Sequence, residues 1–344
     1  MNTPDALISE TELKAVHTSI HRILEALDQI LLGHHELHKL VLIGIFSRGH
    51  ILLEGLPGVG KTAMVKALST LLALEFNRIQ FTPDLMPGDI LGTNILEETD
   101  NGSREMVFRP GPVFTNLLLA DEINRASPKT QSAMLEAMQE NAVTLLGVTR
   151  PLPFPFFVLA SQNPIEMEGT YPLPEAQLDR FLFKLNVSAA QSDALTDIIT
   201  TRRRGEAPKL DIAMTRQELE AVYAAMDQIY LSRPVANYIA RLTAAANPES
   251  PEALTSVKEF LAYGPSPRAA IAMAEASRAA ALLAGRPTVS FDDVKAIAPP
   301  VLNHRLLLNY KARLDNITVS DIIEKLLQEV SMSGTALPDD VEIK

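Results

Sequence analysis

One short stretch constrains this chain more than any other, namely residues 51–62, which read ILLEGLPGVGKT. Within it, Gly55–Thr62 matches the phosphate-loop pattern G-x-x-x-x-G-K-[ST]. The apolar residues Ile51–Leu53 predict a buried strand before the loop, and the helix formers of Ala63–Leu68 predict a helix after it. A helix N-terminus offers unpaired N–H groups and a positive dipole end to a polyphosphate. The stretch therefore predicts a nucleotide-binding site.

The positions of this loop have different expected roles. Gly55, Gly58 and Gly60 allow the backbone to bend round the phosphates without Cβ clashes. Lys61 is expected to reach the β- and γ-phosphates, and the hydroxyl of Thr62 is expected to bind Mg²⁺. The same nucleotide-binding set is predicted to include Pro57, Val59 and Ala63.

Composition narrows the remaining possibilities. A chain of 344 residues is long enough for two domains with a real core. The net charge of −11 argues against a general nucleic-acid binder, because phosphate backbones require a basic surface. The absence of cysteine excludes disulfides and thiolate zinc sites. No signal peptide and no apolar run of roughly 20 residues is found, so we expect a soluble, cytoplasmic protein without a membrane span.

The first half of the chain alternates short apolar segments with helical ones, which predicts an α/β fold with a parallel sheet. Two hairpins are also predicted. One has its turn at Asp100–Gly102, between extended pieces at 93–96 and 105–108. The other turns at Gly147, with arms at Ala142–Leu146 and Phe154–Phe156.

From about residue 193 helical patterns dominate, which predicts a second, all-helical domain. The expected domains are residues 1–195 (α/β nucleotide-binding domain), 196–335 (all-helical domain) and 336–344 (mobile acidic tail). Three clustered histidines, His34, His35 and His38, lack metal-ligand spacing, so we expect a capping or surface role for them.

Polar residues at strand ends complete the predicted site. Asp121 and Glu122 end an apolar strand, so Asp121 is expected to hold Mg²⁺ through water and Glu122 to polarise the attacking water. Asn163 ends the next apolar strand and is expected beside Glu122. Arg180 lies near a strand start, and Arg268 lies in the first turn of a helix, which is the unfavourable end for a cation unless it serves a ligand.

Taken together, these residues resemble the AAA+ ATPases and, among them, the MoxR family. Gly55–Thr62 resembles the Walker A motif and Leu117–Glu122 resembles Walker B. Asn163 resembles sensor 1, Arg180 the arginine finger and Arg268 sensor 2. The two predicted hairpins resemble the helix-2 insert and the pre-sensor-1 hairpin. The match extends over residues 23–335, and five motifs occur in the family's order.

The resemblance implies an αβα parallel-sheet core followed by an all-α lid, with ATP and Mg²⁺ as cofactors. It implies a homo-oligomeric ring, usually a hexamer, in which Arg180 serves the nucleotide of the neighbouring subunit. Family members resemble chaperones that remodel client proteins or insert metal into them, often with a von Willebrand factor A domain partner. The family usually has Gly-Gln near the adenine, whereas this chain has Gly33 and His34, a departure that bears on nucleotide affinity and base preference.

Two other classes of function remain open at this stage. A nucleic-acid-dependent motor is one, since similar inserts occur in such motors, although the tip at 146–150 carries only one basic residue. Salt-dependent DNA binding would favour that class. A nucleotide-gated scaffold with little turnover is the other, and the joint presence of Glu122, Asn163 and Arg180 argues against it.

Overall fold

The computed structural model describes residues 7–56, 58–98, 104–163, 169–188, 192–201 and 210–332. The chain divides into two compact units, each with its own contacts. One unit comprises Ser19–Glu220, and the other comprises Met1–Thr18 together with Ala221–Lys344. The predicted tail at 336–344 lies outside the described residues.

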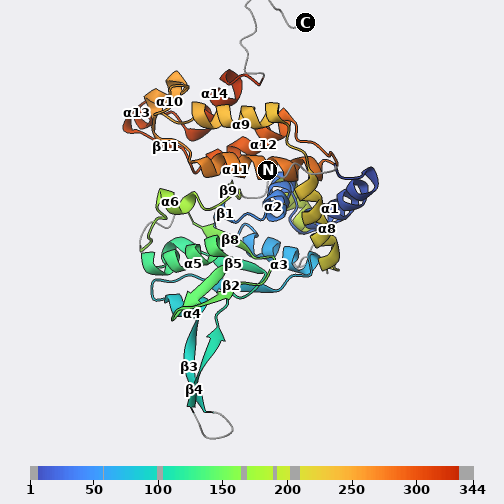
Figure 1. Ribbon diagram of the computed structural model, residues 1–344, viewed down its shortest axis with the longest axis vertical. Coiled ribbons are helices and arrows are strands. Elements are labelled where there is room, and N and C mark those ends of the chain that lie inside the picture. Colours follow the sequence, from blue (N-terminus) through green and yellow to red (C-terminus); the bar gives the residue numbers. More distant parts are fainter. Residues whose placement is uncertain are drawn as a thin grey trace, which may run out of the picture. The chain divides into compact units, whose positions relative to one another are not determined.

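A five-stranded parallel sheet, ordered β2-β5-β8-β1-β9, forms the centre of the unit Ser19–Glu220 (Figure 1). Its strands are β1 (Ile51–Glu54), β2 (Phe76–Gln80), β5 (Leu117–Asp121), β8 (Phe157–Gln162) and β9 (Phe183–Asn186). The register places Gln80 opposite Asp121 and Leu53 opposite Ser161. Since parallel strands end at one edge, the polar residues that follow them meet there. This confirms the predicted parallel sheet.

Helices cover both faces of this sheet. The covering helices are α2 (His35–Phe46), α3 (Lys61–Leu71) and α5 (Pro128–Glu140), and α1 (Glu10–Ile30) precedes α2 along the chain. On one face, Leu52 of β1 shares a buried cluster with Met134 of α5. On the other face, α2 approaches so closely that a Cβ on Gly44 would lie 2.5 Å from Cδ1 of Ile51. Because successive strand side chains point to opposite faces, Ile51 and Leu52 anchor the two helical layers separately.

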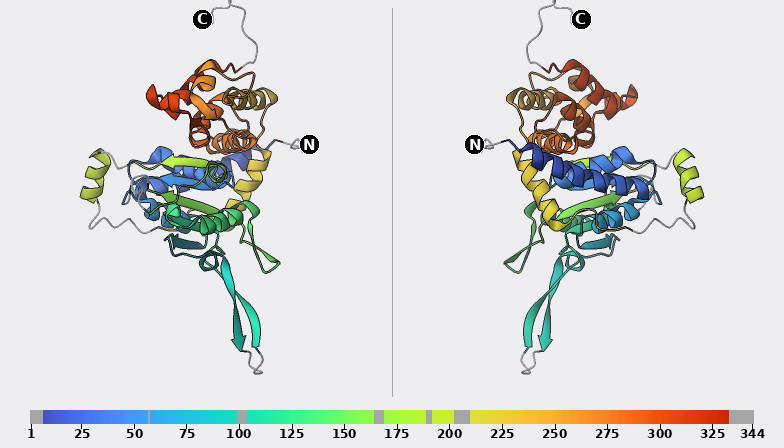
Figure 2. Two further views of the ribbon diagram at one scale, coloured as in Figure 1. Left: turned by 90° about the vertical axis from the view of Figure 1, so that its left-hand side faces the viewer. Right: turned by 90° about the vertical axis from the view of Figure 1, so that its right-hand side faces the viewer.

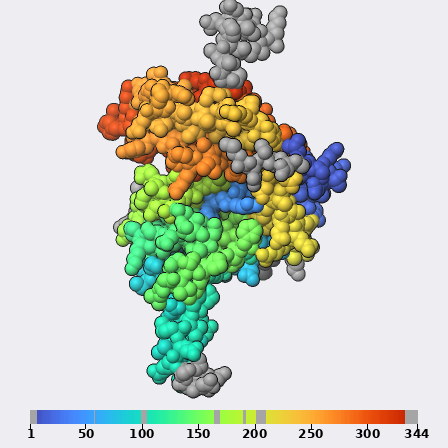
Figure 3. Space-filling view, viewed as in Figure 1, coloured from blue at the N-terminus to red at the C-terminus, as the bar shows by residue number. Residues whose placement is uncertain are grey.

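Two antiparallel hairpins project from the same unit (Figure 2). The first pairs β3 (Gly92–Glu98) with β4 (Arg104–Pro110), as predicted, and forms a narrow arm in the space-filling view (teal in Figure 3). Its predicted turn, Asp100–Gly102, lies outside the described residues. The second pairs β6 (Ala142–Leu145) with β7 (Val148–Pro151).

The predicted second arm of that hairpin, Phe154–Phe156, is wrong. The returning strand begins at Val148, directly after a two-residue turn in which Leu146 and Gly147 have φ angles of 49° and 77°. Two consecutive positive φ angles match the right-handed twist of the flanking strands, so a tight turn closes the hairpin early. Phe156 packs instead into the buried cluster of the sheet.

The second unit is helical, as predicted, and also contains a short antiparallel pair of strands. Its elements are α9 (Arg233–Ala245), α10 (Thr255–Phe260), β10 (Leu261–Tyr263), α11 (Pro267–Leu283), α12 (Phe291–Leu302), β11 (Leu307–Leu308), α13 (Tyr310–Leu314) and α14 (Val319–Glu329). The remaining elements of the chain are α4 (Pro87–Leu91), η1 (Ile123–Arg125), α6 (Glu175–Leu178), α7 (Ser192–Thr201) and α8 (Arg216–Gln228).

His50, the residue before β1, links α5 to the sheet. Its Nε2 donates to the carbonyl oxygen of Met138 at 3.0 Å, and its Nδ1 accepts from the backbone N–H of Val158 at 3.1 Å. Because a carbonyl only accepts and an N–H only donates, the two contacts require a neutral imidazole. Burial lowers the pKa of His50 to about 4, although the hydrogen bond to Met138 acts in the opposite direction.

We expect the free energy of unfolding to fall as the pH drops from 6.5 toward 4, with His50 contributing about 3 kcal/mol to the loss. Within that window the unfolded chain binds a proton that the folded chain excludes. Above it, His50 is neutral in both states. Urea titrations at several pH values measure the effect. His50→Gln, which keeps a donor for Met138 but does not titrate, should show a shallower pH slope, and equal slopes would contradict this account.

Candidate functional site

The predicted phosphate loop connects the carboxyl end of β1 to the first turn of α3. Gly58 and Gly60 have φ angles of 84° and 91°, in the left-handed region that glycine adopts without steric cost. Gly55 is required for another reason, because a Cβ atom there would lie 2.4 Å from the carbonyl oxygen of Val187. Pro57 lies outside the described residues. The loop is therefore packed against the residue that follows the edge strand β9.

Lys61 begins α3, and its side chain reaches back over the loop. Its Nζ donates a hydrogen bond of 2.6 Å to the carbonyl oxygen of Gly55. Partial burial lowers the pKa of Lys61, whereas the carboxylates of Asp121 and Glu122 act in the opposite direction. An ammonium group is thus held at a helix N-terminus, where the first backbone N–H groups have no partners within the helix.

Asp121 and Glu122 lie at the carboxyl end of β5, where Ser161 of the neighbouring strand β8 contacts both. Oγ of Ser161 donates to Oδ1 of Asp121 at 2.5 Å and accepts from the backbone N–H of Glu122 at 3.0 Å. Glu122 has φ and ψ angles of 56° and 49°. This left-handed conformation costs a residue other than glycine about 1–3 kcal/mol, and such strain concentrates at functional sites.

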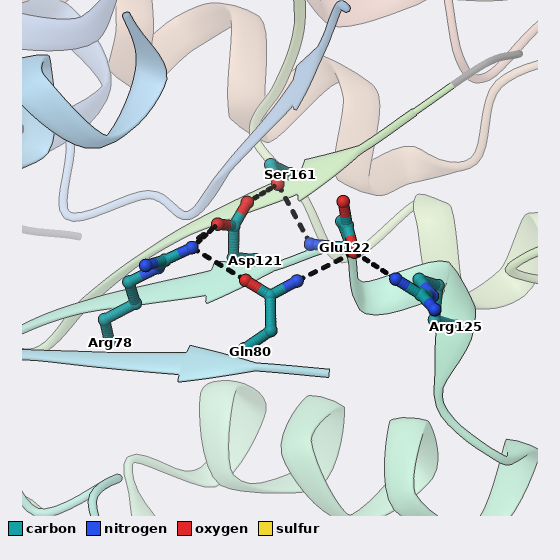
Figure 4. Close-up of polar contacts among 6 residues, drawn as sticks. All are labelled: Arg78, Gln80, Asp121, Glu122, Arg125 and Ser161. Atoms are coloured by element: carbon teal, nitrogen blue, oxygen red, sulfur yellow. Dashed lines mark hydrogen bonds and ion pairs between the residues drawn. The ribbon is translucent and has the colours of Figure 1, made fainter. Parts of the chain in front are cut away.

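Arg78 and Gln80 of β2 contact the two acids from the other neighbouring strand (Figure 4). Nη2 of Arg78 donates to Oδ2 of Asp121 and to Oε1 of Gln80, both at 2.7 Å. Nε2 of Gln80 donates to Oε2 of Glu122 at 2.7 Å, and the same oxygen accepts from Nη1 of Arg125 at 2.9 Å. The side chains of β2 therefore connect the two acids through one continuous chain of hydrogen bonds.

A cavity of about 350 Å³ lies at the carboxyl edge of the sheet. Its described lining comprises Gly58, Gly60, Lys61, Thr62, Ala63, Asp121, Glu122 and Asn163, all predicted from the sequence, together with Arg78 and Gln80. Small-molecule sites have volumes of roughly 300–1,000 Å³, so the cavity has a suitable size for a compact ligand. Asn163 is buried directly after β8, on the same edge as Glu122.

Other predicted site residues are not among the described lining of this cavity. Gly55 and Val59 belong to the loop around it. Arg180 follows α6, and its Nε is buried without a hydrogen-bond partner among the described residues. Arg268 belongs to the other unit, where Oγ of Ser266 accepts a hydrogen bond of 3.2 Å from its backbone N–H at the start of α11.

Gly33 and His34, also outside that lining, connect α1 to α2. His34 occupies the N-cap position of α2 without a side-chain capping bond. The predicted capping or surface role is wrong for His38, which is fully buried with Nδ1 lying 2.7 Å from Oδ1 of Asp28. The other carboxylate oxygen lies 2.5 Å from Nδ1 of His35. Within the described ranges, no group of three or more histidine, cysteine, aspartate or glutamate side chains is arranged to hold a metal ion.

Comparison with known proteins identifies the family. A model of the ATPase family associated with various cellular activities (AAA) matches residues 50–183, and a model of the AAA lid domain matches residues 253–326. Chaperone MoxR1 of Mycobacterium tuberculosis is 42% identical over 317 residues, which cover 92% of this chain and 83% of that protein. The chain belongs to the MoxR family of AAA+ ATPases.

Further members and one solved structure agree with this assignment. Protein MoxR of Methylorubrum extorquens is 29% identical over 319 residues, covering 87% of this chain and 91% of that protein. A crystal structure of a candidate ATPase from Cytophaga hutchinsonii is 37% identical, with a TM-score of 0.85 and coverage of 94% of this chain and 97% of that one. These matches confirm the predicted AAA+ core followed by a helical lid.

In this MoxR-family site, sequence reasoning missed four residues that the structure brings to the acids, namely Arg78, Gln80, Arg125 and Ser161. The available signal was the polar pair Arg78 and Gln80, two positions apart and therefore on one face of the predicted strand.

None of the helices in the described ranges combines the length and apolar character that crossing a bilayer requires.

Proposed function

We propose that this MoxR-family chain hydrolyses ATP and uses the reaction to remodel, mature or insert metal into client proteins. The observation that carries the proposal is the cavity in which Lys61, Asp121 and Glu122 converge at a helix N-terminus. A cation beside unpaired N–H groups suits phosphates, and two carboxylates on the same edge suit a cation and a water.

The side chains around the cavity fit a magnesium nucleotide. The hydroxyl of Thr62 and the carboxylate of Asp121 offer hard oxygen ligands for Mg²⁺ within one lining. When bound, the ion neutralises charge on the phosphate oxygens. Glu122 takes the proton of the attacking water, and Asn163 orients that water or the terminal phosphate. Gly33 and His34 lie near the base in this proposal, and Arg268 acts from the lid.

The proposal extends to assembly. Active subunits form a homo-oligomeric ring, a hexamer, in which Arg180 completes the neighbour's site. The buried Nε of Arg180, which has no hydrogen-bond partner among the described residues, supports a role that needs a further partner. A von Willebrand factor A domain protein and a client protein complete the assembly.

Exposed apolar side chains on the hairpins favour a protein client over a specific nucleic acid. Leu96 and Met106 lie opposite each other on β3 and β4, and Leu146 lies at the tip of the second hairpin, all largely exposed. Apolar surface of this kind suits contacts with proteins, whereas nucleic-acid phosphates require basic side chains. A relative named Chaperone MoxR1 supports the same choice.

ATP turnover per subunit, measured against protein concentration at fixed Mg-ATP, tests the proposal. We expect specific activity to climb steeply and then level off, because a site shared between subunits is complete only in the assembled ring. The protein is sized at each concentration so that assembly and activity are compared directly. Hydrolysis by a monomer would contradict the shared site, and absence of hydrolysis by the ring would overturn the ATPase proposal.

A further inference from the structure

Arg78 occupies the carboxylate that the proposed metal site requires. Its Nε and Nη2 lie 3.2 Å and 2.7 Å from Oδ2 of Asp121, while Oδ1 accepts the hydroxyl of Ser161. The Asp121 side chain is only 13% exposed, so water competes weakly for either oxygen. Both carboxylate oxygens are therefore engaged by side chains of the neighbouring strands (Figure 4).

The two neighbouring acids explain why the positively charged Arg78 lies beside Asp121. Asp121 and Glu122 are consecutive acids on one edge, and each accepts from an arginine, Arg78 for the first and Arg125 for the second. Bringing two carboxylates together without counter-ions disfavours the charged forms of both. A divalent cation on Asp121 supplies the same compensation. Arg78 and such a cation are therefore alternatives at Oδ2.

We infer that Arg78 is a positioning residue that stands in for the metal on Asp121 and yields Oδ2 when Mg²⁺ binds with a nucleotide. The inference rests on the proposed nucleotide site and deepens it. In consequence, Arg78 sets how strongly nucleotide affinity depends on Mg²⁺, since the ion must displace charge-assisted hydrogen bonds before Asp121 can assist it.

Another role for Arg78 leads to a different expectation. The guanidinium also lines the cavity, and its planar fork suits phosphate oxygens. If Arg78 were chiefly a phosphate ligand, its removal would weaken nucleotide binding equally with and without Mg²⁺. If it is the stand-in for the metal, removal exposes Asp121 to the phosphates when Mg²⁺ is absent and frees Asp121 for the ion when it is present.

The first experiment measures the Kd of a fluorescent ADP analogue in EDTA and in Mg²⁺ for wild type and Arg78→Ala. We expect the Kd in EDTA divided by the Kd in Mg²⁺ to be about tenfold larger in the variant than in wild type. This factor corresponds to one charge-assisted hydrogen bond. Arg78→Lys, which keeps the charge, should return the ratio toward the wild-type value. Arg109→Ala, which removes an exposed arginine paired with Glu97 on the β3–β4 hairpin, is the matched control.

An unchanged or smaller ratio in Arg78→Ala overturns the inference.

A second measurement needs no nucleotide and so separates the inference from the proposed function. Mg²⁺ alone should raise the melting temperature of Arg78→Ala but not that of wild type, because only the variant lacks the Arg78 hydrogen bonds to Oδ2 of Asp121. Equal shifts in both proteins overturn the inference as well. If wild type fails to bind the ADP analogue, the proposed nucleotide site is wrong. The melting experiment still decides the role of Arg78.

Discussion

Replacing Glu122 with glutamine is expected to lower kcat for ATP hydrolysis by about 10²–10⁴-fold while nucleotide binding is retained. Glutamine keeps the shape of the side chain and can still accept from Gln80 and Arg125 through its carbonyl oxygen. It cannot take a proton from water, so the loss falls on the chemical step. Single-turnover phosphate release and binding of a fluorescent nucleotide measure the two properties separately.

The control for this variant is Glu136→Gln, which changes an exposed glutamate on α5 in the same way. It should hydrolyse ATP at the wild-type rate. Turnover of Glu122→Gln within about tenfold of wild type would remove Glu122 from the role of general base.

Replacing Arg180 with alanine is expected to lower kcat by about 10³-fold, the contribution of trans arginines in related phosphoryl transfer. The buried Nε has no hydrogen-bond partner among the described residues, so the substitution removes no hydrogen bond of that atom. The rate effect should therefore greatly exceed the effect on thermal stability. Turnover and melting temperature of the assembled variant measure the two.

Mixing the two inactive variants shows which subunit Arg180 serves. In a mixed ring, an Arg180→Ala subunit supplies Glu122, and a neighbouring Glu122→Gln subunit supplies Arg180, so some interfaces regain both groups. Activity should reappear on mixing under conditions that exchange subunits. No recovery despite demonstrated exchange would mean that Arg180 acts within its own subunit.

Much of the core was predictable because its central strands, β1, β5 and β8, are buried on both faces. Such strands give apolar runs, and parallel pairing then places their carboxyl ends together, which located Asp121 and Asn163 beside the phosphate loop. The glycines of the phosphate loop could be predicted equally well, because their role depends on the local backbone and not on a distant residue.

The errors came from features that leave little trace in one sequence. Leu146 adopts a positive φ, a conformation that sequence rules assign to glycine or asparagine, so the turn of β6–β7 was extended too far. The bounds of helix α12 are also hard to predict from the sequence, because Pro299 and Pro300 lie inside it. The Ser290–Asp293 capping box nevertheless starts the helix, and the prolines fall near its end.

The hydrogen-bond network around the acids was missed for a different reason. Arg78 and Gln80 become neighbours of Asp121 and Glu122 only through the β2–β5 register, which joins residues more than forty positions apart. Asp28 and His38 likewise meet across the turn between two helices. Pairing of this kind depends on tertiary structure and not on local spacing.

The hydroxyl group of Ser161 is held in one orientation by its hydrogen bonds. A hydroxyl carries one proton, and Ser161 already accepts from the N–H of Glu122, so its own proton is directed at Asp121. A serine in water samples several rotamers, whereas here two neighbours select one. The entropy of aligning this dipole is lost when the chain folds and not when a ligand arrives or reacts. The edge of the sheet is thus preorganised before a ligand arrives.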